Sequence, residues 1–212
     1  RALVSGETFF DAKRAFLENR FGLQAFECYA TSDTGLIGYE SEARAGLLVD
    51  ESLIVELVEP GGTRPVGHGE IGEVVVTAFN PDYPLIRYAT GDLSSLLHGE
   101  SPCGRTNMRL AGWSGRVAEL TEYRGIKLQP RAVIEAANRH DLVGPLCLFV
   151  TRAGLSFEYE APEVNPDIEP RIEATLRALA GLSSETDLVV RNRPAGELDG
   201  NAKLIEDQRE AE

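Results

Sequence analysis

Apolar runs in the first half of the chain alternate with short polar segments that contain glycine, a pattern typical of strands joined by turns. The run Ala2–Val4 predicts a short buried strand, and the residues after it predict a helix from a cap at Thr8 to about Phe21, stopped by Gly22. Further strands are predicted at residues 25–30, 47–49, 52–58, 73–78 and 92–97. This half therefore predicts one strand–helix–strand unit followed by mainly β structure.

The second half of the chain has a different pattern, in which helices stand between short strands. It predicts an open α+β domain of about 100 residues, with a boundary near Gly112–Ala118. The charged tail Glu206–Glu212 is expected to fray. The expected elements are strands at 117–121, 126–128, 147–152, 155–160 and 187–191 and helices at 131–139 and 168–180, with a turn at 124–125 and a hairpin around 153–154.

Composition places the chain among soluble globular proteins, because 42% of its 212 residues are hydrophobic and 26% are charged. Its 21 Lys and Arg residues against 34 Asp and Glu residues give a net charge of −13, so neither nucleic acid nor an anionic membrane is expected as a partner. The sequence has no apolar run of membrane-spanning length and no signal peptide. Three scattered cysteines, Cys28, Cys103 and Cys147, fit a reducing compartment, so a cytoplasmic location is expected. The first residue is Arg1 and a strand follows at once, which we interpret as a piece of a longer protein.

One candidate site is the stretch Pro84–Asp92, with the sequence PLIRYATGD. An apolar strand here delivers Thr-Gly-Asp on a tight glycine turn. A carboxylate in that place can accept hydrogen bonds from a vicinal diol, such as the 2′- and 3′-hydroxyls of ribose. The alternative is a plain turn in which Asp92 bonds to its own backbone, and the tripeptide alone favours that alternative.

A second candidate site is Tyr29–Gly35, with the sequence YATSDTG, directly after a predicted strand. Small hydroxyl residues and backbone N–H groups there suit a phosphate. Asp33 supplies a hard oxygen ligand for Mg²⁺, and Tyr29 has a ring that can stack on a purine. The alternative is an ordinary polar turn after a strand, which this stretch alone also favours.

Taken together, five segments occur in an ordered series: Ser5–Glu7, 29–35, 84–92, Gly115–Arg116 with Arg124–Gly125, and 200–203. The series resembles the C-terminal half of the acyl- and aryl-CoA ligases of the adenylate-forming superfamily, and most closely the phenylacetate–CoA ligase-like group. The Cys-Gly-Arg segment within 101–106 also resembles that group. The resemblance covers nearly the whole chain, and five ordered motifs are far more specific than any one of them.

The resemblance implies an enzyme that joins a carboxylic acid to a thiol in two steps. The acid attacks the α-phosphate of ATP to give an acyl-adenylate and pyrophosphate, and the thiol of coenzyme A then displaces AMP. The implied substrates and cofactors are phenylacetate or another aryl acid, ATP/AMP, Mg²⁺ and coenzyme A, and a homodimer is left open. The implied fold is α+β, a fragment of an α/β superfamily: residues 1–115 belong to a mixed β part of the large adenylate-binding domain, and 116–212 form a small mobile domain that rotates between the steps.

The resemblance also assigns a role to each matched residue. The adenine would be lined by Ser5, Gly6, Glu7 and Tyr29, and Ala30 would also belong to the cofactor site. The AMP phosphate would be contacted by Thr31 and Ser32, and Mg²⁺ would be held by Asp33. Asp92 would bind the ribose diol and Arg116 would reach the nucleotide from the side of the hinge. Gly125 would lie on the hairpin that lines the coenzyme A channel.

Several positions depart from the pattern of the family. Asn201 stands where the family has its adenylation lysine, and Lys203 follows two residues later. Asp33 replaces a Glu and is shorter by one C–C bond, ~1.5 Å, and Ala118 replaces a hinge Asp. The phosphate-binding loop of the family belongs upstream, so this chain alone is expected to be inactive. Three readings stay open: Lys203 serves through a shifted loop, the chain is a degenerate relative that binds a nucleotide or a partner, or the acyl group passes to an acceptor other than coenzyme A.

Two further expectations concern residues outside these motifs. Trp113, near the boundary, is expected to pack between domains rather than to contact a substrate. The pair Glu158 and Glu160 on a predicted strand is expected to face solvent.

Overall fold

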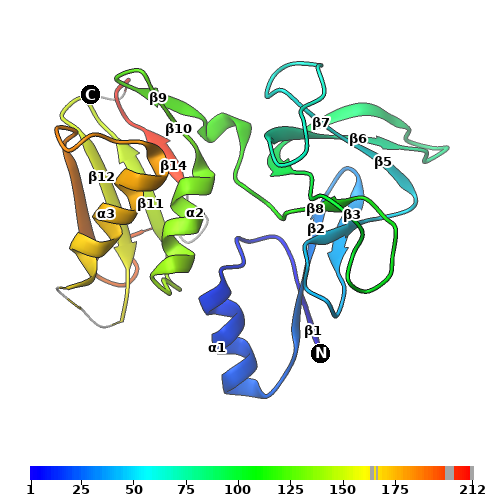
Figure 1. The fold of residues 1–212 in the computed structure, drawn as a ribbon, viewed down its shortest axis with the longest axis horizontal. Helices are drawn as coiled ribbons and strands as arrows, with labels where there is room; N and C mark the ends of the chain where they lie inside the picture. The colour runs from blue at the N-terminus through cyan, green and yellow to red at the C-terminus, as the bar shows by residue number, and fades with distance from the viewer. Residues whose placement is uncertain (163–164, 166, 199–202, 211–212) are drawn as a thin grey trace. The chain divides into compact units, whose positions relative to one another are not determined.

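The computed structural model describes residues 1–162, 165, 167–198 and 203–210 and has an α+β fold with mixed sheets (Figure 1). The chain divides into two compact units. The first unit contains Arg1–Phe9 and Phe16–Val117, and the second contains Phe10–Ala15 and Ala118–Glu212. Among the residues that the structure describes, no helix has the length and apolar character needed to span a membrane.

The first unit contains a five-stranded sheet with the order β1-β2-β3-β4-β8. β1 and β2 pair in parallel and are joined by helix α1, so the predicted strand–helix–strand unit is confirmed. The remaining pairs of this sheet are antiparallel. The bounds are β1 Ala2–Val4, α1 Asp11–Phe21, β2 Ala25–Thr31, β3 Gly35–Glu40, β4 Leu47–Val49 and β8 Arg109–Leu110, of which β3 and β8 were not predicted.

The start of α1 corrects the predicted cap at Thr8. The helical bonds begin with the Arg14 amide donating to the carbonyl of Phe10 at 3.1 Å, and the helix starts at Asp11. Phe10 is only 4% exposed, and burial of its ring outweighs the capping preference of Thr8. The end of the helix is as predicted, because Gly22 takes a positive φ of 62° and its amide donates to Glu18 at 2.9 Å.

A three-stranded antiparallel sheet completes the first unit, with β5 (Leu53–Val58), β6 (Ile71–Ala78) and β7 (Leu85–Ser95) in that order. β6 is rich in valine and almost wholly buried, as its strand prediction required. β6, β5 and the five-stranded sheet share one core cluster: Tyr29, Ile37, Leu47, Val49, Val55, Leu57, Val74, Val76 and Leu110.

The stretch that ends at Asp92 is not the predicted tight turn, and no separate strand begins there. β7 continues through it, and β6 pairs with it on both sides. Between the pairs Val75↔Ala89 and Glu73↔Leu93, two steps along β6 face four steps along β7, so β7 bulges. Gly91 permits this bulge with a φ of 75°, a conformation that glycine adopts without strain.

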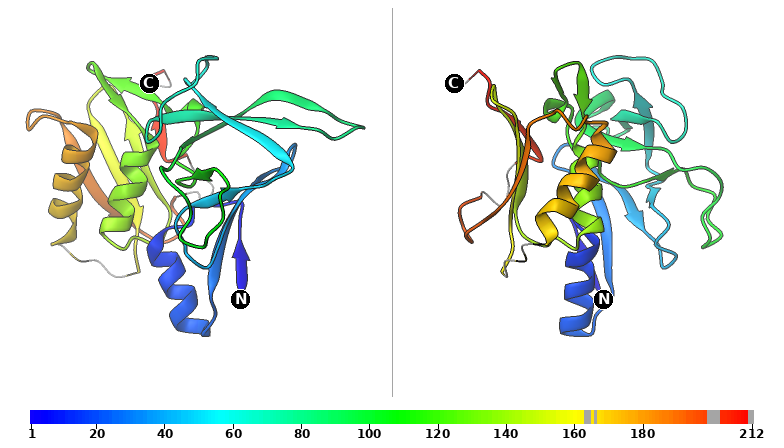
Figure 2. Two further views of the ribbon diagram at one scale, coloured as in Figure 1. Left: turned by 45° about the vertical axis from the view of Figure 1, so that its right-hand side comes forward. Right: turned by 60° about the vertical axis from the view of Figure 1, so that its left-hand side comes forward.

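The second unit is built on a four-stranded sheet with the order β13-β12-β11-β14. Helices α2 and α3 lie side by side on one of its faces (Figures 1 and 2). The buried positions of these helices follow the helical spacing that buries one stripe, and they are Pro130, Val133, Ala136 and Ala137 on α2 and Ile172 and Leu176 on α3. The bounds are β9 Thr121–Tyr123, β10 Ile126–Leu128, α2 Pro130–Arg139, β11 Leu146–Val150, β12 Leu155–Glu160, α3 Ile168–Ala180, β13 Leu188–Arg193 and β14 Ile205–Asp207.

Three expectations for the second unit are wrong. Val117–Glu119 forms a 3₁₀ turn rather than a strand, and β9 starts only at Thr121. The first two residues of the tail that was expected to fray, Glu206 and Asp207, belong to β14, because the preceding Leu204 and Ile205 are buried and the strand pairs in parallel with β11. Glu158 and Glu160 do not face solvent: they are 7% and 8% exposed.

Truncation of the core of the second unit tests this packing. Phe157 is fully buried on β12, so Phe157→Ala is expected to lower the free energy of unfolding by about 3–5 kcal/mol through the cavity that it leaves. Phe79→Ala is the control, because that ring is 67% exposed and its loss is expected to change stability by less than about 0.5 kcal/mol. Urea unfolding followed by circular dichroism measures both, and equal losses would contradict the assigned core.

Candidate functional site

The bulge in β7 places Asp92 in the interior of the first unit, where its residue is only 5% exposed. Its Oδ2 accepts a hydrogen bond from the hydroxyl of Tyr29 at 2.8 Å, and its Oδ1 accepts one from Nε1 of Trp113 at 3.0 Å. Its own amide donates to the hydroxyl of Thr90 at 3.1 Å, which steadies the bulge. A buried carboxylate is stable only when donors satisfy it, and here two aromatic side chains supply them.

Tyr29 comes from β2, so the site joins two sheets of the first unit. Burial of the phenol raises the pKa of Tyr29 far above its ordinary value, and the negative charge of Asp92 raises that pKa further. Tyr29 therefore stays protonated at any physiological pH and donates permanently to Asp92.

Arg116 approaches the same carboxylate from the segment that follows Trp113. Its Nε lies 3.5 Å from Oδ1 of Asp92, and 68% of the arginine side chain is exposed. The amide of Leu93 donates to the carbonyl of Gly115 at 2.8 Å, so this segment runs beside β7. Arg116 is thus a solvent-facing cation at the mouth of a buried acceptor.

The donor set around Asp92 leaves acceptor capacity for a ligand. A carboxylate offers about four lone-pair directions. Tyr29 occupies one on Oδ2, while Trp113 and Arg116 both face Oδ1. Within the described part of the chain, Oδ2 accepts from Tyr29 alone, so it keeps a lone pair that can accept one hydroxyl of a ligand such as a diol.

The loop after β2 forms a compact turn closed by its own side chains. The hydroxyls of Thr31 and Thr34 lie 2.8 Å apart, and the amide of Thr34 donates to Oγ1 of Thr31 at 3.2 Å. Ser32 is exposed, as are Ala30 and Asp33. The polar turn that the alternative interpretation describes is therefore present, and it holds Ser32 and Asp33 at the surface.

Asp33 is tied to β7 through Tyr88, whose hydroxyl donates to Oδ2 of Asp33 at 2.9 Å. This hydrogen bond raises the pKa of Tyr88 above its ordinary value. In the described part of the chain, no group of three or more His, Cys, Asp or Glu residues could hold a metal ion. A single carboxylate is nevertheless a common protein contribution to Mg²⁺ when a substrate phosphate completes the shell. The donor type of Asp33 fits, and its metal role remains a prediction.

Ser5, Gly6 and Glu7 follow β1 and are exposed, with Gly6 at a φ of 86°. Because β1 and β2 are parallel neighbours, Ser5–Glu7 and the Thr31 loop leave the sheet at the same edge. The carboxyl ends of parallel strands are where ligands commonly bind in such sheets. The structure therefore brings four of the sequence motifs together in the first unit.

The remaining predicted residues lie in the second unit. Gly125 and Arg124 form the turn between β9 and β10, with φ values of 82° and 51°. Lys203 is exposed and directly precedes Leu204, which is buried. Asn201 lies outside the described residues.

Sequence reasoning missed two contacts of the predicted site residues, one to Asp92 and one to Asp33. Trp113 was assigned to packing, whereas its indole N–H orients Asp92, and Tyr88 had no role before its bond to Asp33 was seen. The available signal was position, because Trp113 stands two residues before the Gly115–Arg116 motif and Tyr88 lies inside the PLIRYATGD stretch.

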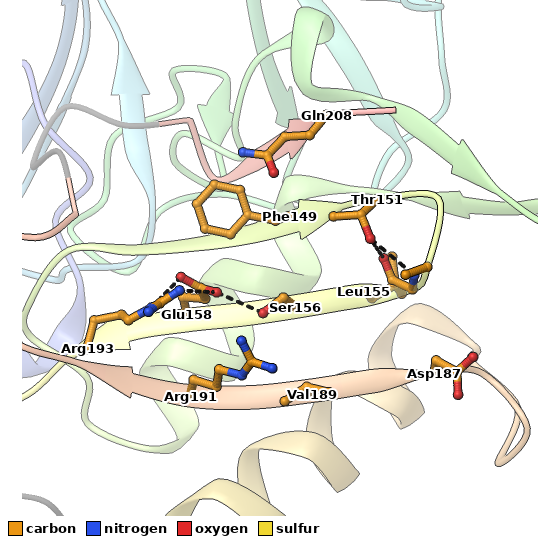
Figure 3. A pocket seen from close by; sticks show the side chains of 12 residues that line it. Phe149, Thr151, Leu155, Ser156, Glu158, Asp187, Val189, Arg191, Arg193 and Gln208 are labelled. Carbon is orange, nitrogen blue, oxygen red and sulfur yellow. Dashed lines mark hydrogen bonds and ion pairs between the residues drawn. The ribbon is translucent and has the colours of Figure 1, made fainter. Parts of the chain in front are cut away.

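A separate groove of about 480 Å³ lies on the face of the second unit's sheet that carries Phe149, Ser156 and Val189 (Figure 3). Within the groove Glu158 and Arg193 form a bidentate ion pair. Nε of Arg193 lies 2.6 Å from Oε2 of Glu158, and Nη2 of Arg193 lies 2.9 Å from Oε1 of Glu158. Two further residues of opposite charge, Arg191 and Asp187, also line the groove.

Comparison with curated proteins finds relatives that share the name phenylacetate-coenzyme A ligase. The phenylacetate-coenzyme A ligase of Thermus thermophilus is 28% identical over 137 residues, which is 62% of this chain and 31% of that protein. The phenylacetate-coenzyme A ligase of Aromatoleum evansii is 29% identical over 148 residues, 68% of this chain and 33% of that protein. The predicted resemblance is confirmed. No protein-family model matches the chain, and the matched part spans about a third of these ligases.

Solved structures show that this chain shares the fold of adenylate-forming ligases. A 2-hydroxyisobutyryl-CoA ligase in its postadenylation state, in complex with R3-HIB-AMP, aligns with a TM-score of 0.75 and 22% identity over 94% of this chain and 46% of that chain. The amide bond synthetase McbA from Marinactinospora thermotolerans aligns with a TM-score of 0.63 and 16% identity over 90% of this chain and 42% of that chain. At these identities the likeness establishes the fold and leaves the chemistry to the residues.

A double-mutant cycle tests whether Tyr29 and Asp92 are coupled as the geometry requires. Tyr29→Phe removes a hydrogen bond to a charged group, expected to cost about 1.5–3 kcal/mol, and Asp92→Ala leaves the buried hydroxyl without its charged acceptor. The double variant should lose less stability than the sum of the singles by about 0.5–3 kcal/mol in urea unfolding. Losses that add within about 0.3 kcal/mol would show that the two groups do not interact. Asp82→Ala, on an exposed loop, is the surface control.

Proposed function

We propose that this chain supplies the ribose-binding part and the small domain of an AMP-forming ligase that activates a carboxylic acid with ATP and transfers the acyl group to coenzyme A. The observation that carries the proposal is the buried Asp92 carboxylate, oriented by Tyr29 and Trp113 and left with one acceptor direction. Relatives named phenylacetate-coenzyme A ligase and a neighbour in complex with an acyl-AMP support it. Phenylacetate or another aryl acid is the proposed substrate.

In the first step, the acid's carboxylate oxygen attacks the α-phosphorus of ATP, a P–O bond forms, and pyrophosphate leaves. Asp92 binds the ribose diol by accepting a hydrogen bond from one of its hydroxyls at Oδ2, and Arg116 faces the nucleotide from the exposed side of that carboxylate. Thr31 and Ser32 are the proposed phosphate contacts. Mg²⁺, when bound at Asp33, would neutralise phosphate charge. Ser5–Glu7, Tyr29 and Ala30 are the proposed walls of the adenine site.

In the second step, the thiolate of coenzyme A attacks the acyl carbon, a C–S bond forms, and AMP leaves. In this proposal residues 1–115 bind the nucleotide and residues 116–212 form a mobile domain. Gly125 lies on the hairpin of that domain that lines the coenzyme A channel. Such domains gate the two half-reactions of a single active site. This chain alone is proposed to be inactive, because the phosphate loop and most of the acid pocket belong to the remainder of the whole protein.

Lys203 is the proposed cation for the attacked α-phosphate. Asn201, at the position where the family has lysine, has no charge to supply, and Lys203 is exposed on the segment that leads into β14. A preorganised ammonium stabilises the charge that develops in the transition state.

A second candidate function is acyl transfer to an acceptor other than coenzyme A. The shared fold with an amide bond synthetase favours it, since an amine can attack the same acyl-adenylate. Asn201, Ala118 and Asp33 favour a third candidate, a degenerate relative that binds a nucleotide or a partner without adenylation.

Nucleotide binding tests the role of Asp92. In the whole protein, Asp92→Ala should weaken ATP binding about ten-fold or more, because hydrogen bonds to a charged acceptor are worth about 1.5–3 kcal/mol. Asp92→Asn should be milder, since it keeps one acceptor oxygen, and Asp82→Ala should bind like the parent. Isothermal titration calorimetry measures the affinities, and unchanged ATP binding by Asp92→Ala would refute the assignment.

Pyrophosphate release tests the role of Lys203. Lys203→Ala should slow acyl-adenylate formation about 10²–10³-fold, while thioester formation from synthetic acyl-adenylate continues. Asn201→Lys should be neutral or harmful, because two ammonium groups would compete for one anion, and Lys13→Ala is the control. Faster adenylation by Asn201→Lys with an unaffected Lys203→Ala would move the catalytic position to residue 201. No activity in the parent with any acid would favour the degenerate relative.

A further inference from the structure

The hairpin of β9 and β10 does not belong to the four-stranded sheet of the second unit. Within the described part of the chain, these two strands pair with each other and with no other strand. A hairpin of two strands is marginally stable in water, so its position depends on contacts with the rest of the unit. Tyr123 and Leu128 supply part of them, because they are 3% and 1% exposed. The turn that joins the strands, at Arg124 and Gly125, is exposed.

Three polar side chains join the base of this hairpin to β14 and the residues after it. The hydroxyl of Thr121 donates to Oδ2 of Asp207 at 2.8 Å and accepts from Nη2 of Arg209 at 3.2 Å. Nε of Arg209 donates to Oδ1 of Asp207 at 2.8 Å, and Nη2 of Arg209 also donates to Oδ2 of that carboxylate. Thr121, Asp207 and Arg209 therefore form a closed cluster, the Thr121 cluster, in which each side chain bonds to both of the others.

Asp207 attaches the Thr121 cluster to the four-stranded sheet. It is the last residue of β14 and pairs with Val150 of β11. The amide of the next residue, Gln208, donates to the carbonyl of Val150 at 2.9 Å. The amide of Arg209 donates to Oδ1 of Asp207 at 3.2 Å, which fixes the backbone of Arg209 beside the carboxylate. The cluster thus connects the hairpin to a sheet with which it shares no strand pairing.

The ion pair inside the Thr121 cluster is partly exposed, with 34% of the Arg209 side chain and 33% of the Asp207 side chain accessible. Exposed ion pairs usually contribute little to stability. A guanidinium that meets both oxygens of one carboxylate is an exception, because its planar fork fixes the orientation of both groups. The hydrogen bond from Arg209, and to a smaller extent that from Thr121, lowers the pKa of Asp207 well below its ordinary value. Asp207 therefore keeps its charge, and the cluster its bonds, at neutral pH.

We propose that Thr121, Asp207 and Arg209 are positioning residues for the thioester-forming step: they hold the base of the β9–β10 hairpin on the four-stranded sheet, and none of them touches a substrate. This inference rests on the proposed function, in which Gly125 lies on the hairpin that lines the coenzyme A channel. Gly125 follows Thr121 by four positions, so a shift of the base moves the turn. A misplacement of about 1 Å can reduce a catalysed rate about 10²-fold.

The test measures the two half-reactions of the whole protein separately. Thr121→Val removes the hydroxyl and keeps a β-branched side chain of similar size. With synthetic acyl-adenylate as the other substrate, it should lower kcat/KM for coenzyme A about ten-fold, because the hairpin is no longer held at one place. ATP–pyrophosphate exchange, which does not use coenzyme A, should stay within about two-fold of the parent. Asp207→Ala and Arg209→Lys should give the same selective loss, since a lysine ammonium lacks the fork that meets both oxygens.

Matched variants separate positioning from folding. Thr121→Ser should behave like the parent, because serine keeps the hydroxyl that donates to Asp207. In an Asp207→Ala background, Thr121→Val should add no further loss, since the two groups act through one contact. Glu135→Ala is the control: it removes an ion pair with Arg139 on α2, in which 40% of the Glu135 side chain and 52% of the Arg139 side chain are exposed. It should match the parent in both half-reactions.

Hydrogen exchange tests the hold on the hairpin without any substrate. In Thr121→Val, the amides of residues 121–128 should exchange about ten-fold faster or more, because local opening of the hairpin becomes easier. The amides of β12, in the centre of the four-stranded sheet, should exchange as in the parent. Equal acceleration in both places would mean that the substitution weakens the whole unit, and it would refute the specific role of the cluster.

The kinetic outcomes distinguish the two proposals. If the parent forms the thioester and Gly125→Ala impairs it, while Thr121→Val and Asp207→Ala do not, the proposed function stands and the positioning inference is refuted. If the cluster variants slow pyrophosphate exchange and thioester formation equally, their role is structural only, and the inference is again refuted. If the parent forms no thioester from any synthetic acyl-adenylate, the proposed function fails and the inference fails with it.

Discussion

Both units bury carboxylates, and each buried carboxylate needs hydrogen-bond donors that particular segments of the chain must bring to it. Asp92 lies inside the first unit only because Tyr29 and Trp113 donate to it from two other segments. Those donors require β2, β7 and the segment after β8 to meet at one point, and they require β7 to bulge so that Asp92 turns inward. The bulge in turn requires the positive φ of Gly91. The stretch Pro84–Asp92, which the sequence predicts as a turn, is therefore part of a bulged strand. Its bulge lets the buried charge of Asp92 reach its hydrogen-bond donors.

The same constraint organises the second unit with different donors. There Glu160 and Glu119 take backbone amides, and the pKa of Glu160 is lowered by them. A carboxylate whose pKa is lower in the folded than in the unfolded state stabilises the fold above its unfolded pKa, and that stabilisation is lost as pH falls through the folded value. The hydrogen bonds that Glu160 accepts from the amides of Gly196 and Leu198 should therefore hold at neutral pH and weaken only in acid, below the ordinary range for glutamate.

Much of the fold could be predicted where the spacing of apolar residues and glycines along the chain agrees with the strand pairing and helix packing of the folded structure. The strands Leu47–Val49, Ile126–Leu128 and Leu155–Glu160 and the helix Ile168–Ala180 match the residues predicted for them, because apolar spacing and glycine turns delimit them. β8 and β14 were missed because they are two and three residues long and exist only through pairing with distant strands. Their hydrogen-bond partners, rather than their own residues, make them strands. The cap at Thr8 failed for a related reason, since burial of Phe10 decided where the helix starts.

The residues of the candidate site also fall into two groups, those that the sequence indicates and those that only the folded contacts reveal. Motif order alone singled out Asp92 and Arg116, which the structure places 3.5 Å apart. It could not assign Trp113 or Tyr88 to the site, because each contacts a site residue only through the folded arrangement of the strands. Residues that would touch a ligand are constrained by the ligand's chemistry and so form a recognisable series. Residues that hold those groups are constrained only by the geometry of this chain. The net charge of −13 does not exclude the proposed anionic nucleotide, because the buried carboxylate of Asp92 is already paired with internal donors while the cation Arg116 beside it faces solvent.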